Sequence, residues 1–181
     1  MNPERLKKPE IIIVDDHLIF RQGLKAIINF EEVGSVIGEA SNGEEFLSLL
    51  SELKPDLILM DIDMPQMNGF EATKKALEIN PDLKIIAFTV FSEDEYYTKM
   101  MMLGAKGFIL KSSGFNELEY AIKLVMKGES YFTGKFQNQI NPEYDAIENV
   151  ISNDNEDSVH IKSRKMIFFP WVVNKISSVN K

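Results

Sequence analysis

The feature that most constrains the fold is an alternation of short apolar runs with helix-length amphipathic segments through the first 130 residues. The apolar runs are predicted strands, at residues 11–14, 33–40, 57–60, 84–90 and 108–110. The segments between them have apolar residues at helical spacing and predict helices from residue 18, from the turn at 41–43, and over 69–79, 93–103 and 115–126. Five strands alternating with five helices are typical of an α/β protein with a doubly wound parallel sheet, covered on both faces.

The strand–helix pattern ends after residue 131, and charge divides the rest of the chain. Residues 136–161 hold six acids and no Lys or Arg, whereas residues 162–181 hold five basic residues and no acid. Subtracting −6 and +5 from the total of −8 leaves −7 on residues 1–135, which is a poor match for nucleic acid. We predict four parts: an N-terminal tail (1–8), a folded domain (9–132), an acidic linker (133–160) and a basic, apolar tail (161–181).

Several classes of protein are disfavoured. The chain has no cysteine, which excludes disulfides and Cys-ligated metals and fits a reducing compartment. The first ten residues are polar and charged, unlike a signal peptide. No window approaches the roughly 20 apolar residues of a membrane span. We therefore expect a cytoplasmic protein with no membrane partner.

Polar residues stand where the predicted strands end. Asp15 and Asp16 follow the first strand, Asp61 ends the third, Thr89 closes the fourth, and Lys111 follows the fifth. Parallel strands bring these ends to one edge of the sheet, which is where such folds bind ligands. Three carboxylates there would repel one another unless cations share the site, and Mg²⁺ suits one or two carboxylates with waters and phosphate oxygens.

This combination favours phosphoryl transfer. A carboxylate beside Mg²⁺ and a lysine is arranged to attack a phosphoryl donor, and Thr89 offers a hydroxyl to a new phosphoryl oxygen. Each residue alone is weak evidence, since polar residues cap strand ends in any α/β fold. Asp15 and Asp16 could simply cap the helix that follows them. Only the five strand-end residues together point to phosphoryl transfer.

Four segments carry a resemblance to a known family. The segments "IIIVDDHLIFRQGL", "PDLILMDIDMPQMNGFEA", "KIIAFTV" and "GAKGFILKSS" resemble the motifs of two-component response-regulator receivers, over about residues 9–130. The first resembles the NarL/LuxR-type subfamily in particular. The resemblance implies a flavodoxin-like sheet with strand order 2-1-3-4-5, followed here by an irregular or partly helical tail. It also implies a phosphoacceptor signalling domain rather than an enzyme, phosphorylated by a sensor histidine kinase.

The resemblance also implies residue roles. Asp61 would be the phosphoacceptor, with Lys111 pairing with the phosphoryl group. The Mg²⁺ ligands would be Asp16 directly, Asp15 directly or through water, Asp61, and the backbone carbonyl of Asp63. Thr89 and Phe108 would form the switch pair. The side chain of Asp63 either tunes the lifetime of the phosphoryl group or is a solvated loop acid. Ser112 departs from the proline that often follows the family's lysine.

Other residues have more ordinary interpretations. His17 is expected to start the first helix, and Asn68-Gly69 to form part of the turn that fixes the acceptor loop. We expect partners to bind the surface of the 93–103 helix and the fifth strand, or a homodimer to form through the first and last helices. Candidate residues for the dimer face are Tyr120, Ile122 and Lys123. Packing in the core explains the apolar ones equally well.

The tail leaves the output open. NarL/LuxR-type regulators continue into a helix-turn-helix domain of about 60 residues, and residues 161–181 faintly resemble its opening. We interpret them as a truncated remnant and predict no sequence-specific DNA binding. One alternative is a full DNA-binding transcription regulator with a truncated C-terminal domain. Another is a haloacid-dehalogenase-type phosphatase, which is disfavoured because that family's metal-binding acids follow its lysine, and no strand-borne acid pair follows Lys111.

Overall fold

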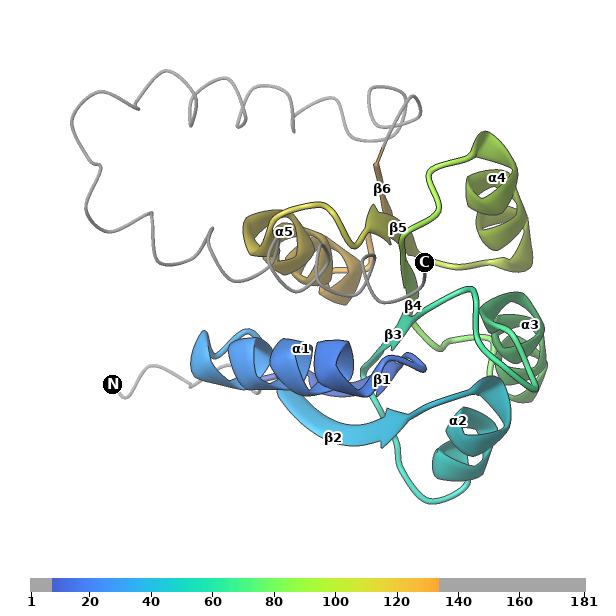
Figure 1. The fold of residues 1–181 in the computed structure, drawn as a ribbon, viewed down its shortest axis with the longest axis horizontal. Coiled ribbons are helices and arrows are strands. Elements are labelled where there is room, and N and C mark those ends of the chain that lie inside the picture. Colours follow the sequence, from blue (N-terminus) through green and yellow to red (C-terminus); the bar gives the residue numbers. More distant parts are fainter. Residues whose placement is uncertain (1–7, 134–181) are drawn as a thin grey trace. The chain divides into compact units, whose positions relative to one another are not determined.

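The structure, a computed structural model, describes residues 8–133 and alternates strands with helices throughout them (Figure 1). The strands are β1 (Glu10–Val14), β2 (Ser35–Ala40), β3 (Leu57–Met60), β4 (Ile85–Thr89), β5 (Gly107–Leu110) and β6 (Tyr131–Phe132). The helices are α1 (Leu18–Phe30), α2 (Gly43–Leu50), α3 (Gly69–Ile79), α4 (Asp94–Leu103) and α5 (Phe115–Met126). The predicted alternation is therefore confirmed.

The strands form one sheet in the order β2-β1-β3-β4-β5-β6. Strand β1 pairs in parallel with β2 and β3, and β5 pairs in parallel with β4 and β6. The predicted 2-1-3-4-5 order is confirmed, and β6 extends it by one short strand. The chain divides into two compact units between Ile85 and Ile86, each of which is described by itself.

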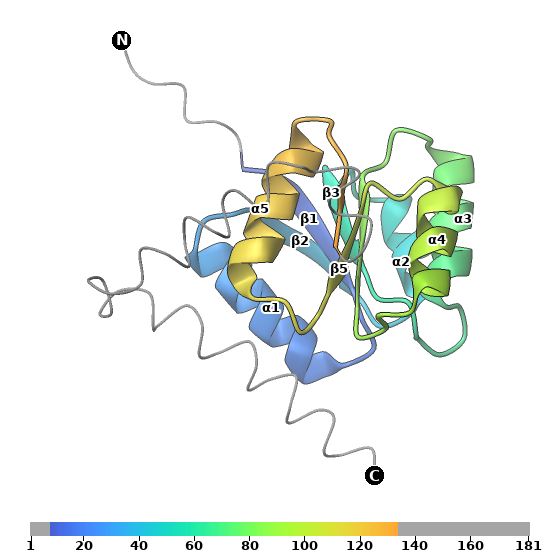
Figure 2. The same cartoon turned by 90° about the horizontal axis from the view of Figure 1, so that it is seen from above.

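In the first unit, α1 lies on one face of strands β1–β3, and α2 and α3 lie on the other (Figure 2). Strands β1 and β3 are buried on both faces, apart from the first residue of β1. Helix α1 turns Phe20, Leu24 and Ile28 inward, at the four-residue spacing that keeps side chains on one face. Two continuous apolar strands between helical layers therefore form the core that holds the loops at their carboxyl ends.

In the second unit, α4 and α5 lie on opposite faces of strands β4–β6 (Figure 2). Three aromatic rings pack under α4. The ring centroid of Tyr97 lies 5.6 Å from that of Phe108 and 5.3 Å from that of Phe132. Helix α5 buries six of its twelve residues.

The structure differs from the sequence-based expectations at β6. This strand was missed, since the strand–helix pattern was expected to end after residue 131. Ile122, a candidate for a dimer face, is 1% exposed and belongs to the core, as the alternative interpretation expected. The expectations for the acidic linker and the basic tail from residue 134 onward lie outside the described residues. Among the helices of residues 8–133, none has the length and hydropathy of a membrane span.

Candidate functional site

The carboxyl ends of β1 and β3 bring four ionisable residues together in the first unit. Asp15, Asp16, His17 and Asp61, here called the acidic cluster, each offer one ligand atom, and these atoms all lie within 4.8 Å of one another. Strands β1 and β3 are neighbours in parallel register, with Val14 opposite Met60. The loops that follow them therefore begin side by side, which explains the convergence.

Asp15 is fixed by hydrogen bonds on every side of its peptide. Its backbone N–H donates to the Ala40 carbonyl at 3.0 Å, and its Oδ1 accepts the His17 backbone N–H at 2.9 Å. Arg21 Nη1 donates to its carbonyl oxygen. Asp15 is 1% exposed. The residue at the N-cap of α1 is His17, whose side chain makes no capping hydrogen bond, so neither aspartate is the cap residue of this helix.

Asp16 and His17 face each other across the cluster. The distance from His17 Nδ1 is 2.8 Å to Asp16 Oδ1 and 3.4 Å to Asp15 Oδ1. Asp16 Oδ1 is buried, and this ion pair with His17 Nδ1 is the polar contact described for it. A cation bound beside it would offset the repulsion between the Asp15 and Asp16 carboxylates.

Asp61 begins the loop after β3 and is 4% exposed. Its backbone N–H donates to the Val14 carbonyl at 2.8 Å, which extends the β1–β3 ladder by one residue. Its Oδ1 accepts the Ile62 backbone N–H at 2.7 Å. This hydrogen bond fixes the rotation of the carboxylate relative to the strand end.

The loop from Asp61 to α3 closes on its own backbone at Gly69. The Gly69 N–H donates to the Ile62 carbonyl at 2.8 Å, and a Cβ at this position would overlap the Asp61 carbonyl oxygen. Only glycine permits that approach. Asn68 caps α3 by accepting the Glu71 N–H, so the predicted Asn68-Gly69 turn joins the loop to the helix. Asp63 is exposed, and its carboxylate lies outside the acidic cluster.

The second unit places Thr89 and Lys111 together at the ends of β4 and β5. The Lys111 backbone N–H donates to the Thr89 carbonyl at 2.6 Å. Thr89 is fully buried, and Lys111 is 4% exposed. Lysine is rarely buried unless its ammonium is paired, so this position is unusual for a structural residue.

Phe108, the other predicted switch residue, lies in the core of the same unit. It is 2% exposed and contacts Tyr97 on α4. Burial raises the pKa of the Tyr97 phenol to about 12. The Thr89 hydroxyl accepts only a long contact of 3.5 Å from the Phe91 N–H among the hydrogen bonds described for it.

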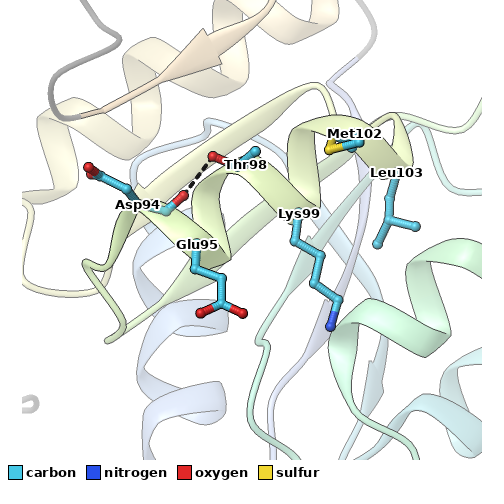
Figure 3. Close-up of a pocket in the computed structure, with 6 residues that line it drawn as sticks. All are labelled: Asp94, Glu95, Thr98, Lys99, Met102 and Leu103. Carbon is cyan, nitrogen blue, oxygen red and sulfur yellow. Dashed lines mark hydrogen bonds between the residues drawn. The ribbon is translucent and has the colours of Figure 1, made fainter.

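A surface hollow of about 680 Å³ lies on α4 and was not anticipated from the sequence (Figure 3). It is lined by Asp94, Glu95, Thr98, Lys99, Met102 and Leu103. The Thr98 hydroxyl donates to the Asp94 carbonyl at 2.7 Å and is thereby directed along the helix. The hollow is open, and its acids do not belong to a group that could hold a metal, so the acidic cluster is the better candidate site.

The donor set of the acidic cluster fits a hard divalent cation. Three carboxylates supply oxygen ligands within 4.8 Å of one another. Sequence reasoning weighed a catalytic role for His17 but favoured the start of the first helix, and it did not consider Arg21. The sequence signal for His17 was its position next to two aspartates. The sequence held no such signal for Arg21, because its approach to Asp15 depends on the turn between β1 and α1.

Comparison with known proteins gives a consistent picture. A family model described as the response regulator receiver domain matches residues 11–123. "Response regulator GacA" of Pseudomonas syringae pv. syringae is 39% identical over 131 residues, which are 72% of this chain and 61% of that protein. "Transcriptional regulatory protein DegU" of Brevibacillus brevis is 34% identical over 154 residues, 85% of this chain and 64% of that protein. The chain thus spans less than two thirds of the length of these relatives.

Solved structures show the same similarity. A two-component response regulator of the LuxR family from Aurantimonas sp. SI85-9A1 superposes with a TM-score of 0.68 and 29% identity, covering 77% of this chain and 99% of that one. A CheY-like receiver domain protein from Methanospirillum hungatei JF-1 gives a TM-score of 0.62 and 28% identity, covering 67% and 96%.

Proposed function

This chain belongs to the response regulator receiver domain family, and from that membership we propose that Asp61 accepts a phosphoryl group with the help of a divalent cation held by the acidic cluster. The resemblance to NarL/LuxR-type regulators of two-component systems is confirmed by the similar LuxR-family structure and by DegU. The observation that carries the proposal is the convergence of the ligand atoms of Asp15, Asp16 and Asp61 within 4.8 Å.

Magnesium is the cation we propose for this site. Asp15, Asp16 and Asp61 would hold it, together with the backbone carbonyl of Asp63. When bound, it would neutralise charge on the oxygens of the transferring phosphoryl group. The convergence of three carboxylates supports this assignment, because Mg²⁺ prefers oxygen ligands and would offset the repulsion between them.

In the proposed reaction, the Asp61 carboxylate is the nucleophile. The Ile62 N–H holds Oδ1, so we assign Oδ2 as the attacking oxygen. An Oδ2–phosphorus bond forms, the bond from phosphorus to the donor breaks, and the leaving group keeps that electron pair. Two features of the Asp61 backbone support this role. Gly69 packs closely against the Asp61 carbonyl, and the Asp61 N–H donates to the Val14 carbonyl, so the backbone that carries the carboxylate is fixed.

Lys111 and Thr89 are assigned to the phosphoryl group. The motifs "KIIAFTV" and "GAKGFILKSS", which contain these two residues and lie within the part of the chain that the receiver family model matches, support the assignment. The Lys111 ammonium would pair with a phosphoryl oxygen. The Thr89 hydroxyl would donate to a second phosphoryl oxygen. Its movement would break only a weak hydrogen bond, because the Phe91 N–H lies 3.5 Å from the hydroxyl oxygen.

We propose that the response to phosphorylation is a population shift in the second unit. As Thr89 turns toward the phosphoryl group, the ring of Phe108, which is already buried, changes its packing against Tyr97, and Tyr97 and Phe132 repack beneath α4. Partners would read the altered surface of α4 and β5. A sensor histidine kinase is the proposed phosphodonor, and regulation of transcription is the proposed output, in line with the name of DegU.

The test is incubation of the full chain with acetyl phosphate and Mg²⁺, followed by intact mass spectrometry. We expect the wild-type chain to gain one phosphoryl group and Asp61→Asn to gain none. Asp63→Asn is the matched control, because it removes an exposed acid two residues away and should still be phosphorylated. Removal of Mg²⁺ with a chelator should prevent the gain. Persistence of the gain in Asp61→Asn would overturn the proposal.

A further inference from the structure

We propose that Arg21 is a positioning residue for the cation site, holding the Asp15–Asp16 peptide in the orientation that directs both carboxylates into the acidic cluster. Arg21 lies on the second turn of α1 and is not itself a member of the cluster. Its Nη1 donates to the Asp15 backbone carbonyl, which belongs to the peptide that joins the two aspartates. Rotation of that peptide would move both carboxylates at once.

A second contact anchors the Arg21 guanidinium. Its Nε lies 3.6 Å from Glu39 Oε2 in an ion pair, and the side chain is only 12% exposed. Glu39 precedes Ala40, whose carbonyl accepts the Asp15 N–H at 3.0 Å. A closed chain of contacts therefore runs from Asp15 through Arg21 and Glu39 back to Asp15, and it joins β1, α1 and β2.

Arginine suits this position better than lysine. Its Nη1 donates to the Asp15 carbonyl, while Nε lies beside Glu39 at ion-pair distance without a hydrogen bond, and a planar, delocalised guanidinium spreads its charge over both places. Lys25, one turn further along α1, has the alternative role. Its Nζ lies 2.6 Å from Glu39 Oε1, its side chain is 44% exposed, and it has no described contact with Asp15. Glu39 thus receives two cations, only one of which extends to the cation site.

The physical consequence is preorganisation. Three acidic side chains repel one another without a cation, and the Asp15–Asp16 peptide would relax to separate them if nothing held it. Residues that hold metal ligands in place contribute strongly to affinity, typically tenfold or more. The positive charge of Arg21 lowers the affinity for the cation, because it repels the cation. In our proposal, the gain in affinity from orienting the two carboxylates is larger than this loss.

This inference rests on the proposed function, and the experiment separates the two. Mn²⁺, a divalent ion with an EPR signal, is titrated into the full chain, and the free ion is measured. We expect Arg21→Ala to raise the dissociation constant about tenfold. Lys25→Met is the matched control, since it removes a cation from the same carboxylate without touching Asp15, and should change the constant less than about twofold.

A structural effect is distinguished by two further measurements. Arg21→Lys keeps the charge but not the planar guanidinium, and we expect it to restore only part of the affinity. Thermal unfolding without metal should show Arg21→Ala and Lys25→Met folded at the titration temperature. If Arg21→Ala is unfolded, Glu39→Gln is used in its place, because it loosens the anchor of Arg21 and should weaken binding severalfold.

The outcomes divide as follows. Failure of the wild-type chain to bind Mn²⁺ would overturn both the cation site and the role of Arg21. Binding by the wild type that is equal or tighter in Arg21→Ala would overturn the role of Arg21 alone. A loss in Arg21→Ala matched by Lys25→Met would do the same, since it would show a general effect of charge.

Discussion

The two compact units hold their functional residues by different means. In the first unit, Asp15 and Asp61 are fixed by backbone hydrogen bonds from β2, β1 and their own loops, and α2 and α3 begin at asparagine caps. In the second unit, Phe108 forms an aromatic cluster with Tyr97 and Phe132, and α4 and α5 begin without a side-chain cap. The aspartates of the first unit are held by directional hydrogen bonds, whereas Phe108 of the second is held by apolar contacts.

Such a contrast would let a receiver domain bind a cation and still respond to a phosphoryl group. A metal site needs ligands held at fixed positions, which hydrogen bonds to the backbone provide. A response needs a second packing of similar free energy, which non-directional aromatic contacts permit. We infer that the first unit supplies the phosphoacceptor and the cation ligands, whereas the second supplies Lys111, Thr89 and the movement. The predictions below test this division, beginning with the largest expected effect.

Among the glycines of the first unit for which an added Cβ is described, Gly69 would bring that Cβ closest to a neighbouring atom. Gly69→Ala places a methyl group on the Asp61 carbonyl, and we expect a loss of about 3 kcal/mol in unfolding free energy together with loss of phosphorylation. Urea denaturation and intact mass measure the two effects. Gly114→Ala in the second unit is the control, since a Cβ there has no neighbour within 4 Å, and should cost about 1 kcal/mol or less. Equal costs at the two glycines would remove the claim that the acceptor loop is the more constrained.

The second unit contributes the positively charged side chain of Lys111. Methionine has nearly the same length without the charge. Lys111→Met should lower the rate of phosphorylation by acetyl phosphate on the order of a hundredfold, because one charge is lost from the transition state. Mn²⁺ affinity should not fall, since the metal ligands belong to the first unit. Lys106→Met changes an exposed lysine just before β5 and should leave the rate unchanged. A large loss of metal affinity in Lys111→Met would contradict the division.

Capping provides a smaller test. Asn42 is 4% exposed, and its Oδ1 accepts the backbone N–H groups of Glu44 and Glu45, both at 3.0 Å. Asn42→Ala should lower the unfolding free energy by about 1 kcal/mol, as loss of a cap generally does. Glu93→Ala at the start of α4 is the comparison, because its side chain makes no capping hydrogen bond. A smaller loss at Asn42 than at Glu93, measured by urea denaturation, would contradict the account.

The smallest effect concerns pH and the aromatic cluster. Burial raises the pKa of Tyr97 to about 12, whereas tyrosine in an unfolded chain titrates near its ordinary value of about 10. The unfolded state therefore loses this proton first as pH rises. The stability that depends on neutral Tyr97 is fully present below about pH 10 and is lost toward pH 12. Tyr97→Phe should flatten the decline of unfolding free energy in this range, and an unchanged decline would place Tyr97 outside the core.

Much of the fold could be predicted from the sequence, because apolar periodicity is a local signal. The bounds predicted for β3, α3 and α5 agree with the structure to the residue. Strand β6 could not be predicted, since two residues have no periodicity and their strand character comes from pairing with β5. Ile122 and Lys123 were grouped by sequence, but the helix turns the first into the core and the second to solvent.

The site was predictable in its acids but not in its supports. Aspartates at strand ends are visible because topology alone brings them to one edge. The approach of His17 to Asp16 depends on the turn that Asp15 makes with the His17 N–H. The role of Arg21 depends on the register that sets Glu39 beside β1, with Ile13 opposite Glu39. Such contacts follow from tertiary geometry, which spacing along the chain does not encode.

The most direct test of the central claim is to locate the phosphoryl group itself. After incubation with acetyl phosphate and Mg²⁺, borohydride reduces an acyl phosphate to an alcohol, and peptide mass spectrometry identifies the altered residue. We predict the change at Asp61 alone, and only when Mg²⁺ is present. A change at Asp63 or at either residue of the Asp15–Asp16 pair, or an unaltered chain, would contradict the account.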